Sequence, residues 1–73
     1  MADTINADMG ANVWKIIANE GDSIEEDGVV LILEAMKMEI PVMAEDDGEI
    51  VKIHVKEGDT VTPGQPLYDI EAE

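Results

Sequence analysis

The sequence predicts a small all-β domain, a flattened antiparallel β-barrel or sandwich of two related four-stranded halves. Three observations predict this fold. The apolar runs are short and rich in β-branched residues, Gly and Asp recur between them, and the second half of the chain repeats the first. No run between these turn signals is long enough to predict a helix. At 73 residues and 45% hydrophobic composition, the chain can bury one modest core.

The first half of the chain divides into four predicted strands. Each is an extended run rich in β-branched or other apolar residues: Thr4–Ala7, Val13–Ala18, Ser23–Ile24 and Val29–Glu34. The segments between them, residues 8–12, 19–22 and 25–28, each combine Gly with Asn or Asp, which tolerate the backbone angles of tight turns. Strict alternation in the second strand predicts one face made of Trp14, Ile16 and Ala18.

The second half repeats this pattern at an offset of 37 residues. The segment Glu20-Gly21-Asp22-Ser23-Ile24 corresponds to Glu57-Gly58-Asp59-Thr60-Val61, and Val13-Trp14-Lys15-Ile16 corresponds to Ile50-Val51-Lys52-Ile53. Two similar halves that each expose an apolar face can bury both faces by pairing about an approximate two-fold axis. Such pairing leaves few open strand edges. Two units are too few for a solenoid.

Lys37 lies in the only segment that the repeat leaves unmatched. The half-repeats span about 4–34 and 41–71 of a single domain covering residues 1–73, so residues 35–40 link them. The apolar run before this linker and the alternating residues after it predict two strands joined by a tight turn. The lysine is therefore expected at the tip of a central β-hairpin, at the opposite end of the barrel from both termini.

Composition excludes several classes of function. Eighteen acidic residues against four lysines and no arginine give a net charge of −14, which disfavours binding to nucleic acid and to anionic membranes. The absence of cysteine excludes disulfides and thiolate chemistry, and a single histidine cannot anchor a typical zinc site. No apolar run reaches the roughly 20 residues of a membrane span, and residues 1–4 lack signal-peptide character. A cytoplasmic location is the resulting expectation.

The stretch Glu34-Ala35-Met36-Lys37-Met38-Glu39 resembles the attachment signature of biotinyl domains, the carrier modules of biotin-dependent carboxylases and decarboxylases. The similarity covers nearly the whole chain. Further similar segments are Trp14-Lys15, Glu20-Gly21-Asp22, Gly48, Glu57-Gly58-Asp59 and Gly64-Gln65-Pro66-Leu67. The related lipoyl domains usually carry Asp-Lys-Ala at the turn, so the two flanking methionines favour biotin. No insertion interrupts residues 13–34, so the chain resembles the thumbless type of biotin carboxyl carrier protein.

The resemblance implies a covalent cofactor carrier. Lys37 would be biotinylated by a biotin protein ligase, with Ala35, Met36, Met38, Glu34 and Glu39 as recognition residues. A lysine amine is mostly protonated at neutral pH, and no residue of the sequence is an evident base, so the ligase would supply deprotonation and the activated acyl group. The modified chain would then shuttle a carboxyl group between a biotin carboxylase and a carboxyltransferase. No catalytic residue and no metal of its own is implied.

Two alternatives stay open at this point. One is a lipoyl acceptor, or an acceptor of both biotin and lipoate, on the same fold. The other is an unmodified barrel used as a structural or adaptor module, in which Lys37 would be an ordinary solvated turn residue. A small enzyme is the weakest reading, because no nucleophile–base pair, metal set or phosphate loop is visible. The initial Met and the extent of the resemblance favour a free protein over a fragment of a longer chain.

Overall fold

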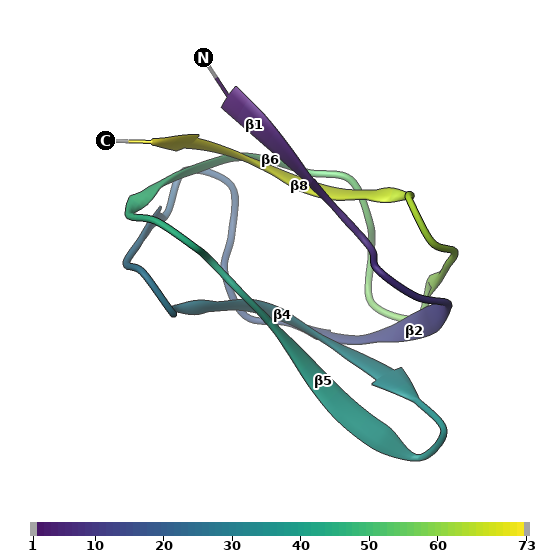
Figure 1. The fold of residues 1–73 in the computed structure, drawn as a ribbon. Coiled ribbons are helices and arrows are strands. Elements are labelled where there is room, and N and C mark those ends of the chain that lie inside the picture. The colour runs from purple at the N-terminus through teal and green to yellow at the C-terminus, as the bar shows by residue number, and fades with distance from the viewer. Residues whose placement is uncertain (1, 73) are drawn as a thin grey trace.

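The computed structural model describes residues 2–72, which form eight β-strands and no helix. The strands are β1 (Ala2–Asn6), β2 (Ala11–Ile16), β3 (Ser23–Ile24), β4 (Val29–Ala35), β5 (Met38–Met43), β6 (Gly48–Ile53), β7 (Thr60–Val61) and β8 (Pro66–Ala72). They pair into two antiparallel sheets that face each other, with orders β1-β8-β6-β3 (the β1 sheet) and β5-β4-β2-β7 (the β5 sheet) (Figure 1). The predicted flattened all-β barrel or sandwich is confirmed.

Several strand boundaries differ from the prediction because long-range partners extend the strands. Ala11 and Asn12, predicted as turn residues, pair with Val61 and Thr60 of β7, so β2 begins two residues early and ends at Ile16. Likewise, β1 begins at Ala2, which pairs with Glu71 of β8, and β4 continues one residue beyond the predicted end. The partners of Ala2, Ala11 and Asn12 lie tens of residues away, so local sequence carries no signal for these pairings. The extension of β4 is local instead, because Ala35 pairs with Met38 across the hairpin turn.

A β-bulge at Trp14 overturns the predicted face of β2. The register between β2 and β4 shifts between Val13 and Lys15, which leaves Trp14 as the additional residue. Val13 is buried, whereas the Trp14 side chain is 47% exposed. The alternation that placed Trp14 on a shared face with Ile16 and Ala18 is therefore wrong. β6 has the same shift in its pairing with β8, between Ile50 and Lys52, at the offset of 37.

The offset of 37 relates three strands of the first half to three of the second, residue for residue. Adding 37 to the first and last residues of β2, β3 and β4 gives those of β6, β7 and β8. The strands β2 and β6 also have the same pattern of buried and exposed residues. Each sheet nevertheless contains two strands of each half, because β1 and β3 join β6 and β8 in one sheet, and β5 and β7 join β2 and β4 in the other. This interleaving means that neither half can form its sheets without the other.

The Glu-Gly-Asp turn of each half is hydrogen-bonded to the bulged strand of the other half. Four bonds form two symmetric pairs: Gly21 N to Ile50 O (2.7 Å), Gly58 N to Val13 O (2.8 Å), Ile53 N to Glu20 Oε2 (2.9 Å) and Ile16 N to Glu57 Oε2 (3.0 Å). The glycine is required because φ is +93° at Gly21 and +94° at Gly58. The repeated Glu-Gly-Asp motif seen in the sequence thus holds the two halves together through hydrogen bonds.

The core lies between the two sheets and is wholly apolar apart from the hydroxyl of Tyr68. Its largest fully buried side chains come from β2, β4, β6, β7 and β8: Tyr68, Leu31, Ile50, Leu67, Val13, Val30 and Val61. β4 and β8 contribute most, and they occupy equivalent positions in the two sheets. Because β4 leads directly into the turn that carries Lys37, this core anchors one strand of the hairpin.

A polar trio on the outer face of the β1 sheet was not expected from the sequence. Asp69 Oδ1 accepts a hydrogen bond from Thr4 Oγ1 at 2.7 Å and lies 3.0 Å from His54 Nε2. Asp69 is the side-chain partner of His54, the single histidine of the chain. The hydrogen bond with His54, and then the one from Thr4, lower the pKa of Asp69 below its ordinary value of 3.8.

Replacing Asp69→Asn is expected to lower the stability of the domain at neutral pH and to flatten its dependence on acid. Because the pKa of Asp69 is lower in the folded state, its contribution is present above about pH 4 and is lost as the pH falls through the folded value. Urea unfolding at pH 7, 4 and 3 measures this. Parallel profiles for wild type and variant would show that the trio does not contribute.

Candidate functional site

The β4–β5 hairpin closes through a two-residue turn made of Met36 and Lys37. Ala35 pairs with Met38 on either side of it, and the pairing continues through Glu34 and Glu39. φ is +54° at Met36 and +63° at Lys37. Positive φ at both central residues defines the type I′ turn, whose twist matches that of the flanking strands. The predicted tight turn with the lysine at its tip is present.

The two turn residues are not those that this backbone prefers. A type I′ turn favours Asn-Gly, because a side chain with a Cβ costs about 1–2 kcal/mol per residue at positive φ. Met36 and Lys37 both carry that cost. Where locally unfavourable residues persist in a strained conformation, the position is a candidate for function. Asp27 also has a positive φ of +66°, but Asp is a residue that tolerates this conformation. The strain at Met36 and Lys37 therefore singles out the turn on physical grounds.

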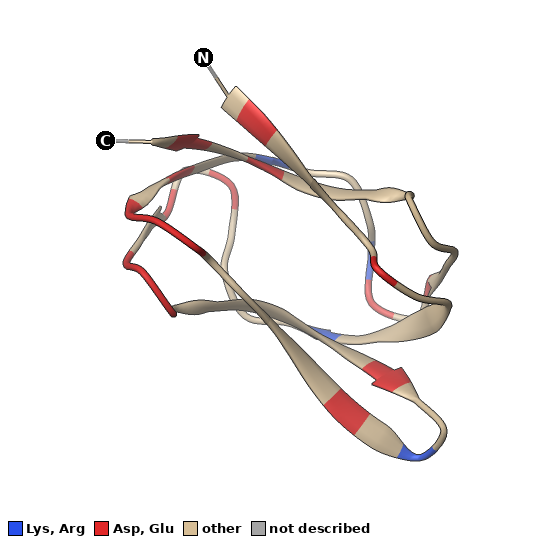
Figure 2. Ribbon diagram, in the orientation of Figure 1, with Lys and Arg blue, Asp and Glu red and all other residues tan. Residues whose placement is uncertain are grey.

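Lys37 is presented to solvent at the end of the molecule that lies furthest from the chain ends. β1 begins and β8 ends on the far side of the domain from the β4–β5 turn (Figure 1). Figure 2 shows the lysine at the tip and acidic residues on both strands behind it. Met36 is 95% exposed and Met38 66% exposed, and among residues 2–72 no ion pair involves Lys37. The amine can thus be approached from outside by another protein.

The five predicted recognition residues lie on different sides of the hairpin. Ala35 and Met38 form a register pair on the face that continues into Leu33 and Ile40, toward the core. Glu34 and Glu39 form the next pair, and strand alternation places them on the opposite, outer face. Met36 is in the turn. The structure therefore brings all five within the same hairpin, but a protein touching every one would have to straddle it.

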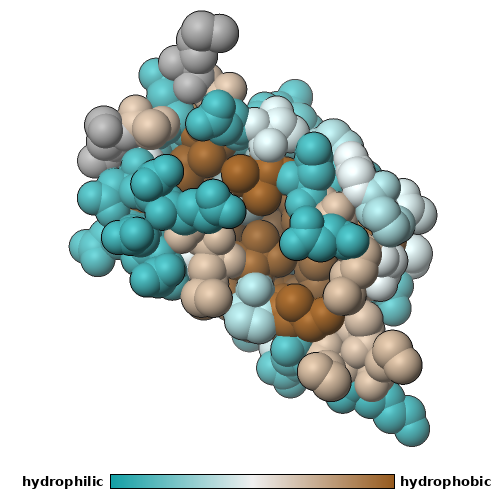
Figure 3. All heavy atoms as spheres, viewed as in Figure 1, coloured by the Kyte–Doolittle hydropathy of each residue, from teal (hydrophilic) through white to brown (hydrophobic). Residues whose placement is uncertain are grey.

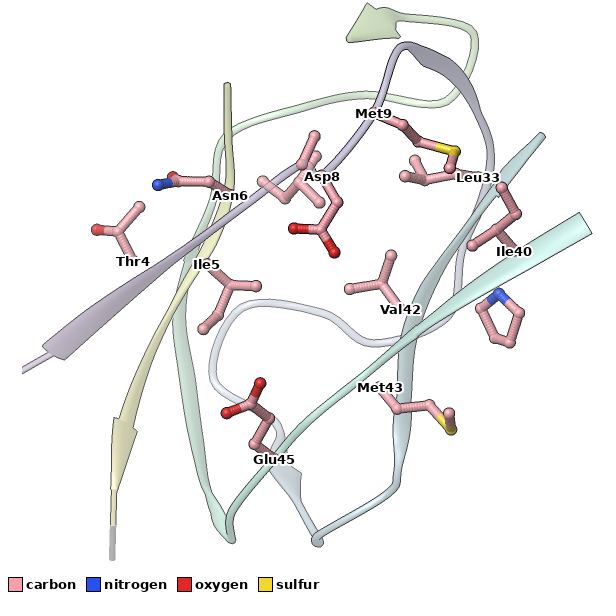
Figure 4. A pocket seen from close by; sticks show the side chains of 13 residues that line it. Thr4, Ile5, Asn6, Asp8, Met9, Leu33, Ile40, Val42, Met43 and Glu45 are labelled. Atoms are coloured by element: carbon pink, nitrogen blue, oxygen red, sulfur yellow. The ribbon is translucent and has the colours of Figure 1, made fainter. Parts of the chain in front are cut away.

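A groove of about 460 Å³ opens between the edge strands β1 and β5, beside the hairpin. Figure 3 shows its apolar floor bordered by hydrophilic residues, and Figure 4 shows the carboxylates of Asp8 and Glu45 turned into it. Ile5, Leu33 and Val42 are among the apolar lining residues, and no described Lys, Arg or His lines it. The groove therefore suits a neutral or cationic group better than an anion. Sequence reasoning did not find it, because β1 and β5 are distant in the chain.

The chemistry available at the hairpin is that of an exposed primary amine. Within residues 2–72, no group of three or more His, Cys, Asp or Glu side chains could hold a metal ion. The same residues include no helix with the length and apolarity needed to cross a bilayer. An amine at the tip of a rigid hairpin can be acylated by a partner that supplies both base and activated acyl group.

A family model described as "Biotin-requiring enzyme", for biotin and lipoyl attachment, matches residues 3–70. The chain belongs to this biotin/lipoyl attachment family. The family resemblance predicted from the Ala-Met-Lys-Met core and the two half-repeats is therefore confirmed. This family consists of carrier domains rather than catalytic ones, so the chain is a carrier-type domain.

Two curated proteins illustrate the range of relatives. The biotin/lipoyl attachment protein of Bacillus subtilis is 42% identical over 67 residues, which cover 92% of each chain. The biotin carboxyl carrier protein of Streptococcus mutans is 41% identical over 69 residues, 94% of this chain and 53% of that protein. Similar domains thus occur both as small proteins of this length and as parts of longer chains.

Solved structures show the same fold in both cofactor classes. A single-chain, multi-domain long-chain acyl-CoA carboxylase contains a region with a TM-score of 0.93 and 29% identity, covering 99% of this chain and 7% of that one. The lipoyl domain of the 2-oxoglutarate dehydrogenase complex from Azotobacter vinelandii has a TM-score of 0.83 and 28% identity, covering 96% and 98%. The backbone alone therefore does not distinguish biotin from lipoate.

Proposed function

We propose that this domain is a biotin carboxyl carrier in which Lys37 is the attachment site. The observation that carries the proposal is the turn itself: a strained two-residue type I′ turn that holds a solvent-facing lysine between two exposed methionines. A structural module with an ordinary turn residue has no need for this arrangement. The carboxylase relatives support the choice of biotin.

The attachment step is an acyl transfer onto the Lys37 amine. A biotin protein ligase would present biotin as a mixed anhydride with AMP. The neutral Nζ attacks the acyl carbon, the C–N bond forms as the C–O bond to AMP breaks, and one proton leaves Nζ for a base of the ligase. Lys37 is exposed, and the exposed Met36 and Met38 stand on either side of it. The ligase would read these residues with Ala35, Glu34 and Glu39.

After modification, the role of the domain is to deliver the group rather than to react. Bound biotin supplies a ring nitrogen that accepts and releases a carboxyl group. The rigid hairpin projects that ring away from the barrel, into the active sites of a biotin carboxylase and a carboxyltransferase in turn. Tethering raises the local concentration of the cofactor at each site without any added binding contact. A cytoplasmic location belongs to the same proposal.

Lipoate is the second candidate, and the lipoyl-domain fold of a solved relative favours keeping it. The small relative from Bacillus subtilis also carries both cofactors in its name. Met36 and Met38 count against pure lipoylation, because lipoyl domains usually have Asp before and Ala after the lysine. Acceptance of both cofactors is compatible with the exposed turn.

Incubation with a biotin ligase, ATP and biotin is expected to add one biotinyl group to the wild type and none to Lys37→Arg. Intact mass and avidin binding measure this. The arginine variant keeps the charge and turn position of the side chain but removes the acylable amine, so it is the matched blank. If the wild type stays unmodified while a known acceptor is labelled, the biotin proposal fails. The same assay with a lipoate ligase tests the second candidate.

A further inference from the structure

Because the two halves repeat at an offset of 37, each residue on the outer face of one sheet can be compared with the equivalent residue on the outer face of the other sheet. The polar trio Thr4, His54 and Asp69 occupies the outer face of the β1 sheet. The equivalent positions of the β5 sheet hold Pro41, Ile17 and Ile32. The backbone is the same in both places: Thr4 pairs with Asp69 as Pro41 pairs with Ile32, and His54 N and Ile17 N each donate to a carbonyl of the neighbouring strand at 2.9 Å.

The apolar trio is not needed to build the domain. Ile17 is 48% exposed, Pro41 is exposed, and Ile32 neither belongs to the core nor packs against it. The β1 sheet shows that this backbone accommodates a hydrogen-bonded polar trio instead. The adjacent bulge residue adds to the contrast, because Trp14 stands where the β1 sheet has the smaller Val51. We call Trp14, Ile17, Ile32 and Pro41 the apolar patch.

The apolar patch lies on the sheet that carries Lys37, and an uncompensated acidic pair separates the two. Glu34 and Glu39 are directly opposite each other on the same outer face, one step nearer the tip than Ile32 and Pro41. Like charges directly opposite on paired strands are unfavourable. No ion pair within residues 2–72 neutralises them. Lys15 of β2 pairs with Ile32 within the patch. Beyond it toward the tip, the face presents Glu34 and Glu39 and then Lys37.

We propose that this outer face of the β5 sheet is the docking surface for the biotin protein ligase, a proposal that rests on the proposed function. The complementary surface would be apolar with basic side chains toward its active site, where they meet Glu34 and Glu39. Pro41 is four residues from Lys37, about 13 Å along the strand at 3.3 Å per residue. Ile17, the member furthest from the tip, donates its N–H to Val30 O, and Val30 is seven residues from Lys37, about 23 Å along the strand. A standard interface of about 800 Å² per partner is about 32 Å across, so a ligase surface that meets the tip near one edge can cover the apolar patch.

The reach of the reacting group favours the ligase over the later enzymes as the occupant. Before modification, the reacting atom is Nζ of Lys37, so the ligase surface must come within a lysine's length of the hairpin. After modification, the acceptor atom lies at the end of a longer arm, and the carboxylase can act from further away. The ligase is therefore the partner that must contact the protein surface around the tip.

The test exchanges the two trios between the sheets. The patch variant carries the residues of the β1 sheet on the β5 sheet: Ile17→His, Ile32→Asp and Pro41→Thr. The reciprocal variant carries the opposite changes away from the tip: Thr4→Pro, His54→Ile and Asp69→Ile. A second version of the patch variant carries Ile32→Asn in place of Ile32→Asp, so that it does not add the negative charge of Asp to the domain. A purified biotin protein ligase is assayed at varied concentrations of each domain, and thermal unfolding is followed in parallel.

The patch variant and its Ile32→Asn version are expected to raise the KM for the domain by about tenfold while kcat stays within about twofold, because contacts equal in ground and transition states are lost. The reciprocal variant should keep the wild-type KM. An unchanged KM in a folded patch variant overturns the docking surface. If the patch variant does not fold, Ile17→Thr at the half-exposed position replaces it, with about a threefold rise expected.

The failure of this proposal is distinct from failure of the proposed function. If the ligase labels the wild type and every folded variant with the same KM, the attachment site stands and the docking surface is wrong. If the ligase labels no form of the chain, including the wild type, the attachment proposal itself fails, and the docking surface with it.

Discussion

Moving the lysine by one residue in either direction is expected to abolish biotinylation and leave the fold intact. The two variants are Met36→Lys/Lys37→Met and Lys37→Met/Met38→Lys. Position 38 is the first residue of β5, paired with Ala35, so an amine there points toward the groove side rather than outward from the tip. A misplacement of even about 1 Å can cost about 100-fold in rate, and these shifts are larger. Intact mass after incubation with ligase measures the loss.

These variants carry their own controls. Each exchange keeps composition and net charge, and the turn still holds non-glycine residues at positive φ, so the unfolding midpoint should match the wild type. Lys37→Arg defines zero labelling. Labelling of either folded variant at the wild-type rate would show that presentation at the turn does not determine modification.

Gly48→Ala is expected to destabilise the domain by about 3 kcal/mol, within the range of overpacked cores. A Cβ at position 48 would lie 2.6 Å from Glu71 O and 2.8 Å from Ile70 Cγ1. The carbonyl belongs to β8 and cannot withdraw without disturbing its pairing with β6. A chain of this size is stable by only about 4–11 kcal/mol, so the loss is a large fraction of the total. Thermal unfolding should shift down by about 12–24 °C.

Gly58→Ala separates this steric effect from a conformational one. A Cβ at Gly58 meets no atom within 4 Å, but φ is +94° there. Its cost should be about 1–2 kcal/mol, from backbone strain alone. Equal losses at the two glycines would contradict the steric explanation for Gly48. The equivalent of Gly48 in the first half is Ala11, a buried residue that already carries a Cβ, so the close approach is specific to one half.

The sequence by itself predicted the class of fold and the hairpin turn that presents Lys37. The runs of β-branched residues and the Gly-Asp turns predicted an all-β chain, because these are local preferences of strand and turn. The offset of 37 predicted two related halves with Lys37 between them, because a repeat is visible without any structure. The Ala-Met-Lys-Met core pointed to the family. Each of these signals is carried by neighbouring residues or by direct comparison within the chain.

Only the tertiary structure decided which residues face outward and which strands share a sheet. The bulge at Trp14 depends on pairing with β4, and it places Trp14 on the outer face instead of the face shared with Ile16 and Ala18 that simple alternation predicted. The interleaving of the halves, the groove between β1 and β5 and the partnership of His54 with Asp69 all join segments distant in the chain. The separation of Glu34 and Glu39 from Ala35 and Met38 follows from the register of the hairpin. Such features depend on which strands meet and in which register, and hydrogen bonds between distant strands leave no local trace in the sequence.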